Sequence, residues 1–209
     1  MKKYLILAGL TLCMWAPNVV SANVVAYLTS ASFNVPGKVP YFETYLSVIG
    51  KSVKFVKNSN VKFQGAVDIT IQFLQNGEVK NGRKYSLNSP EVTDTTKALP
   101  NFIDQQRYSL PNGAYSAEIS IADKNNPGVK PLTTTIQLNI NFADNIITAS
   151  DIQLLESYSK ATMPGTLTKS GYDLVPYVST FYPENISKIK FYAEFYNAKK
   201  ILGENEKMI

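Results

Sequence analysis

The sequence predicts an all-β fold, an antiparallel immunoglobulin-like β-sandwich followed by a second, partial β unit. Three observations lead to this fold class. Apolar and polar residues alternate with a period of two over many short segments, as in strands with one face on a core and the other in water. Turn-forming residues separate these segments, and no segment beyond residue 22 carries apolar residues at helical spacing over a useful length.

The alternation is clearest in the segments 67–73, 115–121 and 132–142. In 132–142, leucine, isoleucine and phenylalanine dominate one face, while threonine, glutamine and asparagine occupy the other. The apolar face of a further segment consists of Ile189, Phe191, Ala193 and Phe195. We therefore expect strands at 24–29, 41–48, 53–57, 67–73, 84–88, 102–109, 115–121, 132–142 and 189–195.

Two Asn-Gly pairs compete for the turn after the strand 67–73. Asn-Gly favours positive φ at both central positions of a tight hairpin, so either Asn76-Gly77 or Asn81-Gly82 can form it. The register of this hairpin therefore stays open. Further along, Leu110 to Tyr115 reads as a turn that feeds a strand, and we expect Tyr115 to bury its ring and return its hydroxyl to nearby backbone.

The first 22 residues have the pattern of a secretory signal peptide. Lys2 and Lys3 precede an apolar run, and Val20-Ser21-Ala22 provides a small-residue cleavage site. The run is shorter than the roughly 20 residues of a membrane-spanning helix, so we expect no transmembrane segment in the mature chain. The sequence thus predicts an exported protein of the periplasm, outer membrane or extracellular space. Acylation at Cys13 as a lipoprotein is the disfavoured alternative, because Leu12 stands where a small residue is usual.

We expect two units after the signal peptide, a β-sandwich domain at 23–143 and a second β-rich unit at 147–209. The composition changes near Asp144-Asn145, where the alternating segments of the first unit end. The second unit is short for an independent sandwich, and isolated small β units are marginally stable. Either a longer chain or a partner is therefore expected to complete it.

Composition argues against several functional classes. The formal charge is +5, or +3 without the two lysines of the first 22 residues, and the basic residues are dispersed, so no nucleic-acid partner is expected. The chain has no histidine, and its single cysteine is Cys13. Histidine-based nucleophilic catalysis and zinc binding are therefore not expected, and neither is any other cofactor.

The remaining polar groups offer weak chemistry. Asp123 begins a segment that resembles the start of a calcium loop, but Pro127 and Thr134 replace two ligands, so a turn is the preferred interpretation. The adjacent pairs Ser159-Lys160 and Ser187-Lys188 point to opposite faces of a strand. Carboxylates that could act as a pair in glycoside hydrolysis stand at outward strand positions, where solvated charge is expected: Glu43, Asp68, Glu118 and Glu194.

Aromatic residues concentrate in the second unit around Pro176 and Pro183. Tyrosine combines a flat apolar ring with a polar tip, so exposed clusters suit contacts with proteins or sugars, although such residues also fill cores. The predicted binding residues are Tyr172, Tyr177, Phe181 and Tyr182. Asn185-Ile186-Ser187 is an acceptor sequence for glycosylation in hosts that modify such sites.

Three stretches together resemble the N-terminal β-rich region of secreted bacterial GWxTD-domain proteins. They are 41–48, 110–123 and 191–197, which read YFETYLSV, LPNGAYSAEISIAD and FYAEFYN. The resemblance covers most of the mature chain and implies an exported, β-rich protein without catalytic residues to assign. The naming motif Gly-Trp-any-Thr-Asp is absent, since the single tryptophan is Trp15.

The sequence therefore predicts a non-enzymatic module of the cell envelope or surface that binds a protein or glycan partner or acts as a spacer. Shape and buried aromatic anchors can supply affinity without reactive side chains. The alternatives are a carbohydrate-binding module that uses exposed tyrosines, and an accessory domain of a secreted hydrolase that uses carboxylates.

Overall fold

The structure is a computed structural model that describes residues 23–179 and 181–203. The predicted signal peptide and Cys13 lie outside the described residues. Export and acylation therefore stay predictions from the sequence.

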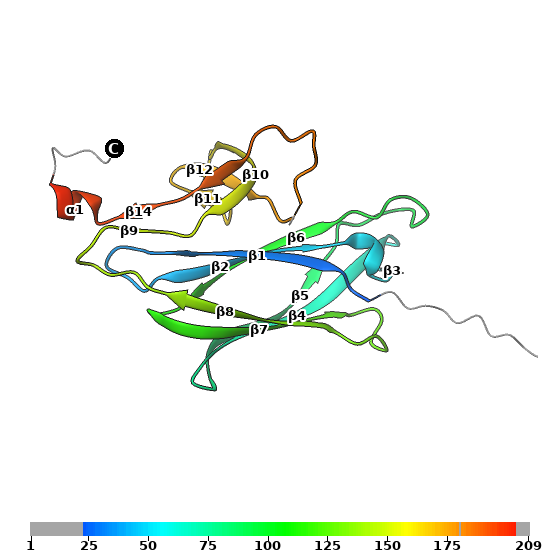
Figure 1. Ribbon diagram of the computed structural model, residues 1–209. Coiled ribbons are helices and arrows are strands. Elements are labelled where there is room, and N and C mark those ends of the chain that lie inside the picture. Colours follow the sequence, from blue (N-terminus) through cyan, green and yellow to red (C-terminus); the bar gives the residue numbers. More distant parts are fainter. Residues whose placement is uncertain (1–22, 180, 204–209) are drawn as a thin grey trace, which may run out of the picture.

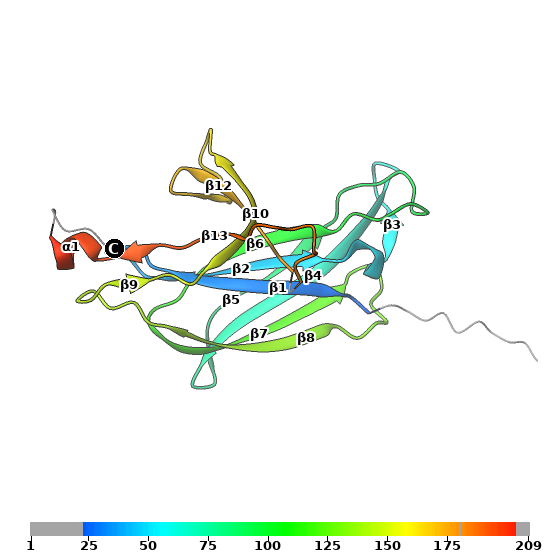
Figure 2. The same ribbon diagram turned by 45° about the horizontal axis from the view of Figure 1, so that its top comes forward.

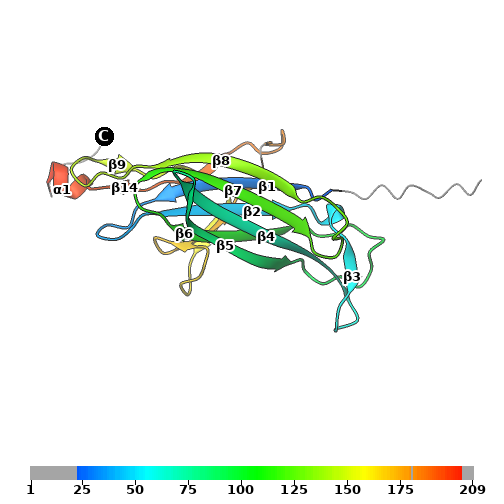
Figure 3. The same cartoon turned by 90° about the horizontal axis from the view of Figure 1, so that it is seen from below.

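Two antiparallel sheets pack face to face as a sandwich (Figure 1, Figure 3). One has the order β1-β2-β6, formed by β1 (Ala26–Phe33), β2 (Tyr41–Val48) and β6 (Phe102–Ser109). The other has the order β5-β4-β7-β8, formed by β4 (Phe63–Gln75), β5 (Glu78–Asn88), β7 (Gly113–Asp123) and β8 (Leu132–Ile140). The short β3 (Phe55–Lys57) pairs with the start of β4, after a single 3-10 turn, η1 (Gly50–Ser52). The predicted all-β, sandwich-like fold class is confirmed.

The core lies between these sheets and follows the predicted alternation. Val67, Ile69, Ile71 and Phe73 on β4 are almost fully buried, and the outward residues between them are more exposed. Phe73 packs against Phe42 on β2 with ring centroids 5.6 Å apart and against Tyr108 on β6 at 4.8 Å. These contacts join the two sheets, so burial of the apolar faces is the main source of stability.

The turn chemistry settles what the sequence left open. Gln75 pairs with Glu78, so Asn76-Gly77 forms the two-residue turn, with φ of 53° and 81°. Asn81-Gly82 lies within β5 instead. The predicted corner at Tyr115 is confirmed, because its ring is buried and its hydroxyl donates to the Pro111 carbonyl at 3.0 Å.

The remaining strands form a second unit beside the sheet β1-β2-β6, on the side away from β4 and β7 (Figure 1, Figure 2). A four-stranded sheet has the order β11-β12-β10-β13, and β9 and β14 form a separate pair. The bounds are β9 (Thr148–Ala149), β10 (Gln153–Lys160), β11 (Thr168–Lys169), β12 (Tyr172–Pro176), β13 (Lys190–Tyr192) and β14 (Phe195–Tyr196), followed by the short helix α1 (Ala198–Leu202).

Hydrogen bonds to backbone groups at the end of β1 dock this unit on the sandwich. Asp151 accepts a hydrogen bond from the Ser32 amide at 2.8 Å through its carboxylate and donates its own amide to the Ser32 carbonyl at 3.1 Å. The Tyr196 hydroxyl accepts from the Asn34 amide at 3.0 Å. The second unit therefore covers the part of the outer face of β1-β2-β6 around Phe33, Glu43 and Tyr45, while Tyr27 and Ile103 on that face remain exposed. The far face of the second unit itself is uncovered.

Candidate functional site

A cluster of polar and charged residues, all buried except Arg107, lies between the sandwich and the second unit. Glu43 on β2 has no exposed surface. One of its carboxylate oxygens accepts from Gln105 Nε2 and Arg107 Nε on β6, each at 2.6 Å, and the other accepts from the Tyr45 hydroxyl and Lys169 Nζ. We call Glu43, Tyr45, Gln105, Arg107, Gln153 and Lys169 the interunit cluster.

Lys169 on β11 brings the second unit into this cluster. Its side chain is almost fully buried, and Nζ also donates to Gln153 Oε1 on β10 at 2.7 Å. The ammonium lies 3.6 Å from the ring centroid of Phe33 on β1, so a cation–π contact adds to the ion pair. Arg107 extends the link, since its NH2 donates to the Thr166 carbonyl at 3.0 Å. Glu43 is thus bonded to both units at once.

For both Glu43 and Lys169, burial and neighbouring charges shift the pKa in opposite directions. Burial alone would raise the pKa of Glu43, but Lys169, Tyr45 and Arg107 outweigh it and hold this pKa below its usual value. For Lys169, burial dominates and lowers the pKa to about 8, although Glu43 pulls it upward. Burial beside Glu43 raises the pKa of Tyr45 far above its usual value, so its hydroxyl remains a proton donor.

The prediction that Glu43 is a solvated surface charge was wrong. The alternation correctly places Glu43 on the face of β2 that points away from the sandwich core, but the second unit covers this face. The other three carboxylates lie apart from it: Asp68 accepts from Ser86, Glu118 is exposed, and Glu194 accepts from the hydroxyls of Tyr192 and Tyr196 at 2.5 and 2.6 Å. No two of these four share a cleft among those found in the described residues.

An apolar surface lies on the second unit, around a hollow of about 510 Å³. Leu155 and Leu174 are buried in its lining, while large side chains remain exposed around them. The exposed fractions are 59 % for Tyr158, 46 % for Tyr172, 63 % for Ile189 and 62 % for Phe191. We call these six residues, with Ser170, Lys190 and Tyr192, the aromatic hollow.

The apolar face predicted for 189–195 is inverted in the structure. Phe191 and Phe195 are exposed, whereas Tyr196 is buried and Tyr192 is half-buried. The tyrosines turn inward because their hydroxyls find partners there: Tyr192 shares a hydrogen bond of 2.8 Å with Ser170, and both tyrosines donate to Glu194. A phenylalanine has no such partner to gain, so the sequence alternation alone could not assign the buried face.

The structure separates the predicted binding residues into two groups. Tyr172 lines the aromatic hollow, where its ring meets that of Tyr158 edge to face at 6.2 Å. Tyr177 and Tyr182 stack on each other with centroids 4.4 Å apart, and the Tyr177 hydroxyl donates to the Phe181 carbonyl at 2.5 Å. Phe181 is 67 % exposed. Tyr177 and Tyr182 thus contact each other and the loop between them. Tyr172 instead belongs to a wider surface with Phe191 and Tyr158, two residues that the sequence did not predict to bind a partner.

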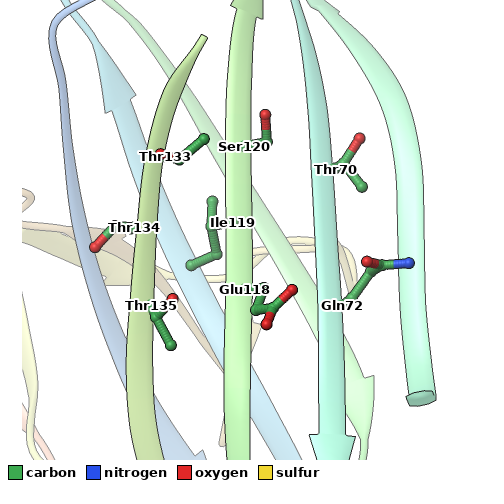
Figure 4. Close-up of a pocket in the computed structure, with 8 residues that line it drawn as sticks. All are labelled: Thr70, Gln72, Glu118, Ile119, Ser120, Thr133, Thr134 and Thr135. Atoms are coloured by element: carbon green, nitrogen blue, oxygen red, sulfur yellow. The ribbon is translucent and has the colours of Figure 1, made fainter. Parts of the chain in front are cut away.

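A second, polar hollow lies on the outer face of β4, β7 and β8 (Figure 4). It holds about 330 Å³ and is lined by Thr70, Gln72, Glu118, Ile119, Ser120, Thr133, Thr134 and Thr135. Glu118 is the single carboxylate among these described residues, so the hollow does not offer the carboxylate pair of a glycoside hydrolase.

The predicted turn at Asp123 uses its carboxylate for the fold. Asp123 is buried, and its oxygens accept from the backbone amides of Lys54 at 2.7 Å and Asn125 at 2.9 Å. Among the described residues, no three His, Cys, Asp or Glu side chains are grouped so that they could hold a metal ion.

Comparison with known proteins finds no matching protein-family model, no matching curated protein and no matching solved structure. Within residues 23–179 and 181–203, no helix has the length and hydropathy needed to cross a membrane. The function is therefore argued from the geometry of this chain.

Proposed function

We propose that the chain is a non-enzymatic module that binds a partner protein through the aromatic hollow. One observation carries the proposal: four large apolar side chains are exposed around a hollow with a buried leucine lining. Contiguous exposed apolar patches on soluble proteins are typical of interaction sites, and aromatic residues with nearby pockets dominate binding energy at protein interfaces.

The hollow suits an apolar side chain of a protein better than a sugar. Its volume of about 510 Å³ leaves room for one aromatic or branched aliphatic side chain. Its polar groups are few, namely Ser170, Lys190 and the tyrosine hydroxyls, and three of them are already engaged. Lys190 Nζ donates to the Glu156 carbonyl at 3.0 Å, Ser170 is bonded to Tyr192, and the Tyr192 hydroxyl also donates to Glu194. A sugar would need more unengaged donors and acceptors to replace its hydration.

The interunit cluster supports the same function by positioning. Sites on rigid elements bind with less loss of conformational entropy than mobile ones. The Glu43–Lys169 pair fixes β11 on the sandwich, and Lys169 also donates to Gln153 on β10. Ser170, directly after β11, and Leu155 on β10 line the hollow. Export, proposed from the first 22 residues, and the resemblance to GWxTD-domain proteins suit an envelope module of this kind.

A titration with small probes tests the proposal. Backbone amide NMR spectra are recorded with N-acetyl-phenylalaninamide, N-acetyl-leucinamide and, as sugar probes, methyl glucoside and N-acetylglucosamine. We expect the two amino-acid amides to shift signals of β10, β12 and β13 and the sugars to leave them unchanged. Sugar-induced shifts without amide-induced shifts would instead establish the carbohydrate-binding alternative.

The chain offers a matched control for this titration. Phe191 and Phe195 are exposed to 62 % and 61 %, but Phe191 lines the hollow and Phe195 does not. Phe191→Ser is expected to abolish the amide-induced shifts, and Phe195→Ser to retain them. Equal loss in both variants, or none in either, would contradict a site at the hollow.

A further inference from the structure

The two sides of the sandwich differ in whether side chains close the gap between their edge strands. On one side β5 and β6 close the gap between the sheets by side-chain hydrogen bonds, from Arg83 to Gln106, from Tyr85 to Asp104 at 2.5 Å, and from Asn81 to the Ser109 carbonyl at 2.8 Å. On the other side β1 and β8 leave a groove of about 340 Å³ between the sheets. Figure 3 shows β8 beside β1 on this side and β5 beside β6 on the other.

The groove exposes part of the sandwich interior. Its lining consists of Ala26, Leu28, Leu46, Ile119, Ile121, Leu132, Thr133 and Thr134. Leu132 and Thr134 lie on the inward face of β8, yet both are exposed, and Ile136 and Leu138 are half-buried. The inward face of this strand therefore lacks the cover that β4 and β7 receive.

The edge of β8 also lacks the features that protect edge strands. β5, at the other edge of the same sheet, carries the charged residues Glu78, Lys80, Arg83 and Lys84 along its length. Its pairing with β4 also contains a register shift, between Phe73 and Leu74 of β4. β8 carries no charge, no proline and no glycine, and its pairing with β7 is continuous over nine residues. Charges, prolines and bulges are the usual protection of an edge strand against pairing with another chain, so the free edge of β8 can pair with a further strand.

We propose that β8 pairs antiparallel with β8 of a second copy of this chain. The strand is complementary to itself. A two-fold axis at Ile136 pairs each residue before Ile136 with the residue equally far after it in the second copy, and both members of a pair lie on the same face of the sheet. Thr133 then faces Asn139, and Thr135 faces Gln137, while Leu132 faces Ile140 across the inward side. In this arrangement the polar pairs lie on the solvent face of the joined sheet. The apolar residues of each copy pair on the inward face, next to the groove of the other copy, and such matched pairs stabilise neighbouring strands.

Charge favours this occupant and this edge. Two copies of a chain with a formal charge of +5, or +3 without the first 22 residues, repel each other, so an edge strand that carries no charge is where they can approach. The edges of β5 and β6 present Lys80, Lys84 and Arg107 and do not meet this condition. A single strand pair buries less than the roughly 1,200 Å² of a stable interface, so the dimer is weak and its population depends on concentration.

Sedimentation velocity from low micromolar to near-millimolar protein tests the pairing. Wild type is expected to shift from monomer to dimer over this range. The double variant Thr135→Lys with Gln137→Lys places four lysines together across the two-fold axis, and we expect it to raise the dissociation constant at least about tenfold. Both side chains are exposed, so the fold is retained, and a far-UV circular dichroism spectrum verifies this.

A charge-matched control separates the edge from a general effect of charge. Val79→Lys with Ile103→Lys adds the same two charges at exposed positions of β5 and β6 and is expected to leave the dimer unchanged. Hydrogen exchange at high concentration should protect amides of β8. A wild type that stays monomeric throughout, an unchanged dimer in the β8 variant, or protection confined to the aromatic hollow would each overturn the proposal.

Discussion

Removing one partner of the Glu43–Lys169 pair should loosen the second unit while leaving the sandwich intact. Both side chains are almost fully buried, so Glu43→Gln leaves an ammonium without a counter-ion on its side of the cluster. Breaking a buried ion pair by removing one partner costs about 3–5 kcal/mol. Because the pair joins the two units, we expect this cost to appear as local opening of the second unit.

The double variant shows whether the pair itself carries the effect. Lys169→Met leaves Glu43 with Arg107, Tyr45 and Gln105, so its cost should be smaller than that of Glu43→Gln. Combining both substitutions removes both charges, and a buried ion pair replaced by uncharged residues of similar size is often close to neutral. We therefore expect the double variant to be less destabilised than the sum of the single variants.

Native-state hydrogen exchange measures this change strand by strand. In Glu43→Gln, the opening free energy of β10 and β12 should fall by the stated amount, while that of β4 and β7 should remain unchanged. The exposed pair Lys80–Glu78 gives the control, because Glu78→Gln removes a surface charge and should alter neither. A loss below about 1 kcal/mol at β10 and β12, or an equal loss in all strands, would refute a buried interunit cluster.

Three further predictions concern the core, the corner and the pH dependence. Phe73→Ala should lower the free energy of unfolding by about 3–5 kcal/mol in urea titrations, because Phe73 is fully buried between the sheets; a loss near that of a surface substitution would contradict its place in the core. Tyr115→Phe should cost about 1–2 kcal/mol in the same titrations, because the Pro111 carbonyl loses its donor; an unchanged midpoint would show that water replaces the bond. Lys169 titrates at a pKa of about 8 in the folded chain against 10.5 for the ordinary group, so unfolding takes up a proton between these values and stability rises with pH there. Relative to Lys169→Met, the wild type should thus gain roughly 1.4 kcal/mol per pH unit between pH 8 and 10.5. A flat difference would show that the pKa is not lowered, and a falling one that it is raised.

The sequence predicted the sandwich well because its physical signals are local. The strands 41–48 and 102–109 have the predicted bounds, and Asn76-Gly77 and Tyr115 act as their chemistry requires. Positive φ in a tight turn and a hydroxyl four residues from its acceptor depend on the immediate chain. They do not depend on what packs against it.

The candidate site was harder to predict because it depends on which faces are covered. Alternation gives the face of a residue but not the identity of the layer above it, and this is why Glu43 was misplaced. One signal was present: both faces of 41–48 carry aromatic or apolar residues, a pattern typical of a strand buried on both sides. Lys169 and Gln153 gave no such signal, since no residue near them in the sequence indicates a buried partner. Glu43, the partner of Lys169, lies more than a hundred residues away along the chain.

The most direct test of a protein-binding surface on the second unit is photo-cross-linking in cells that produce the chain. Benzoylphenylalanine replaces Phe191 in the aromatic hollow or Phe195 outside it, two positions of nearly equal exposure. We predict a discrete protein adduct from position 191 that Tyr172→Ala weakens, and none from position 195. Identical adduct patterns from both positions, or no protein adduct from position 191, would contradict the proposed function.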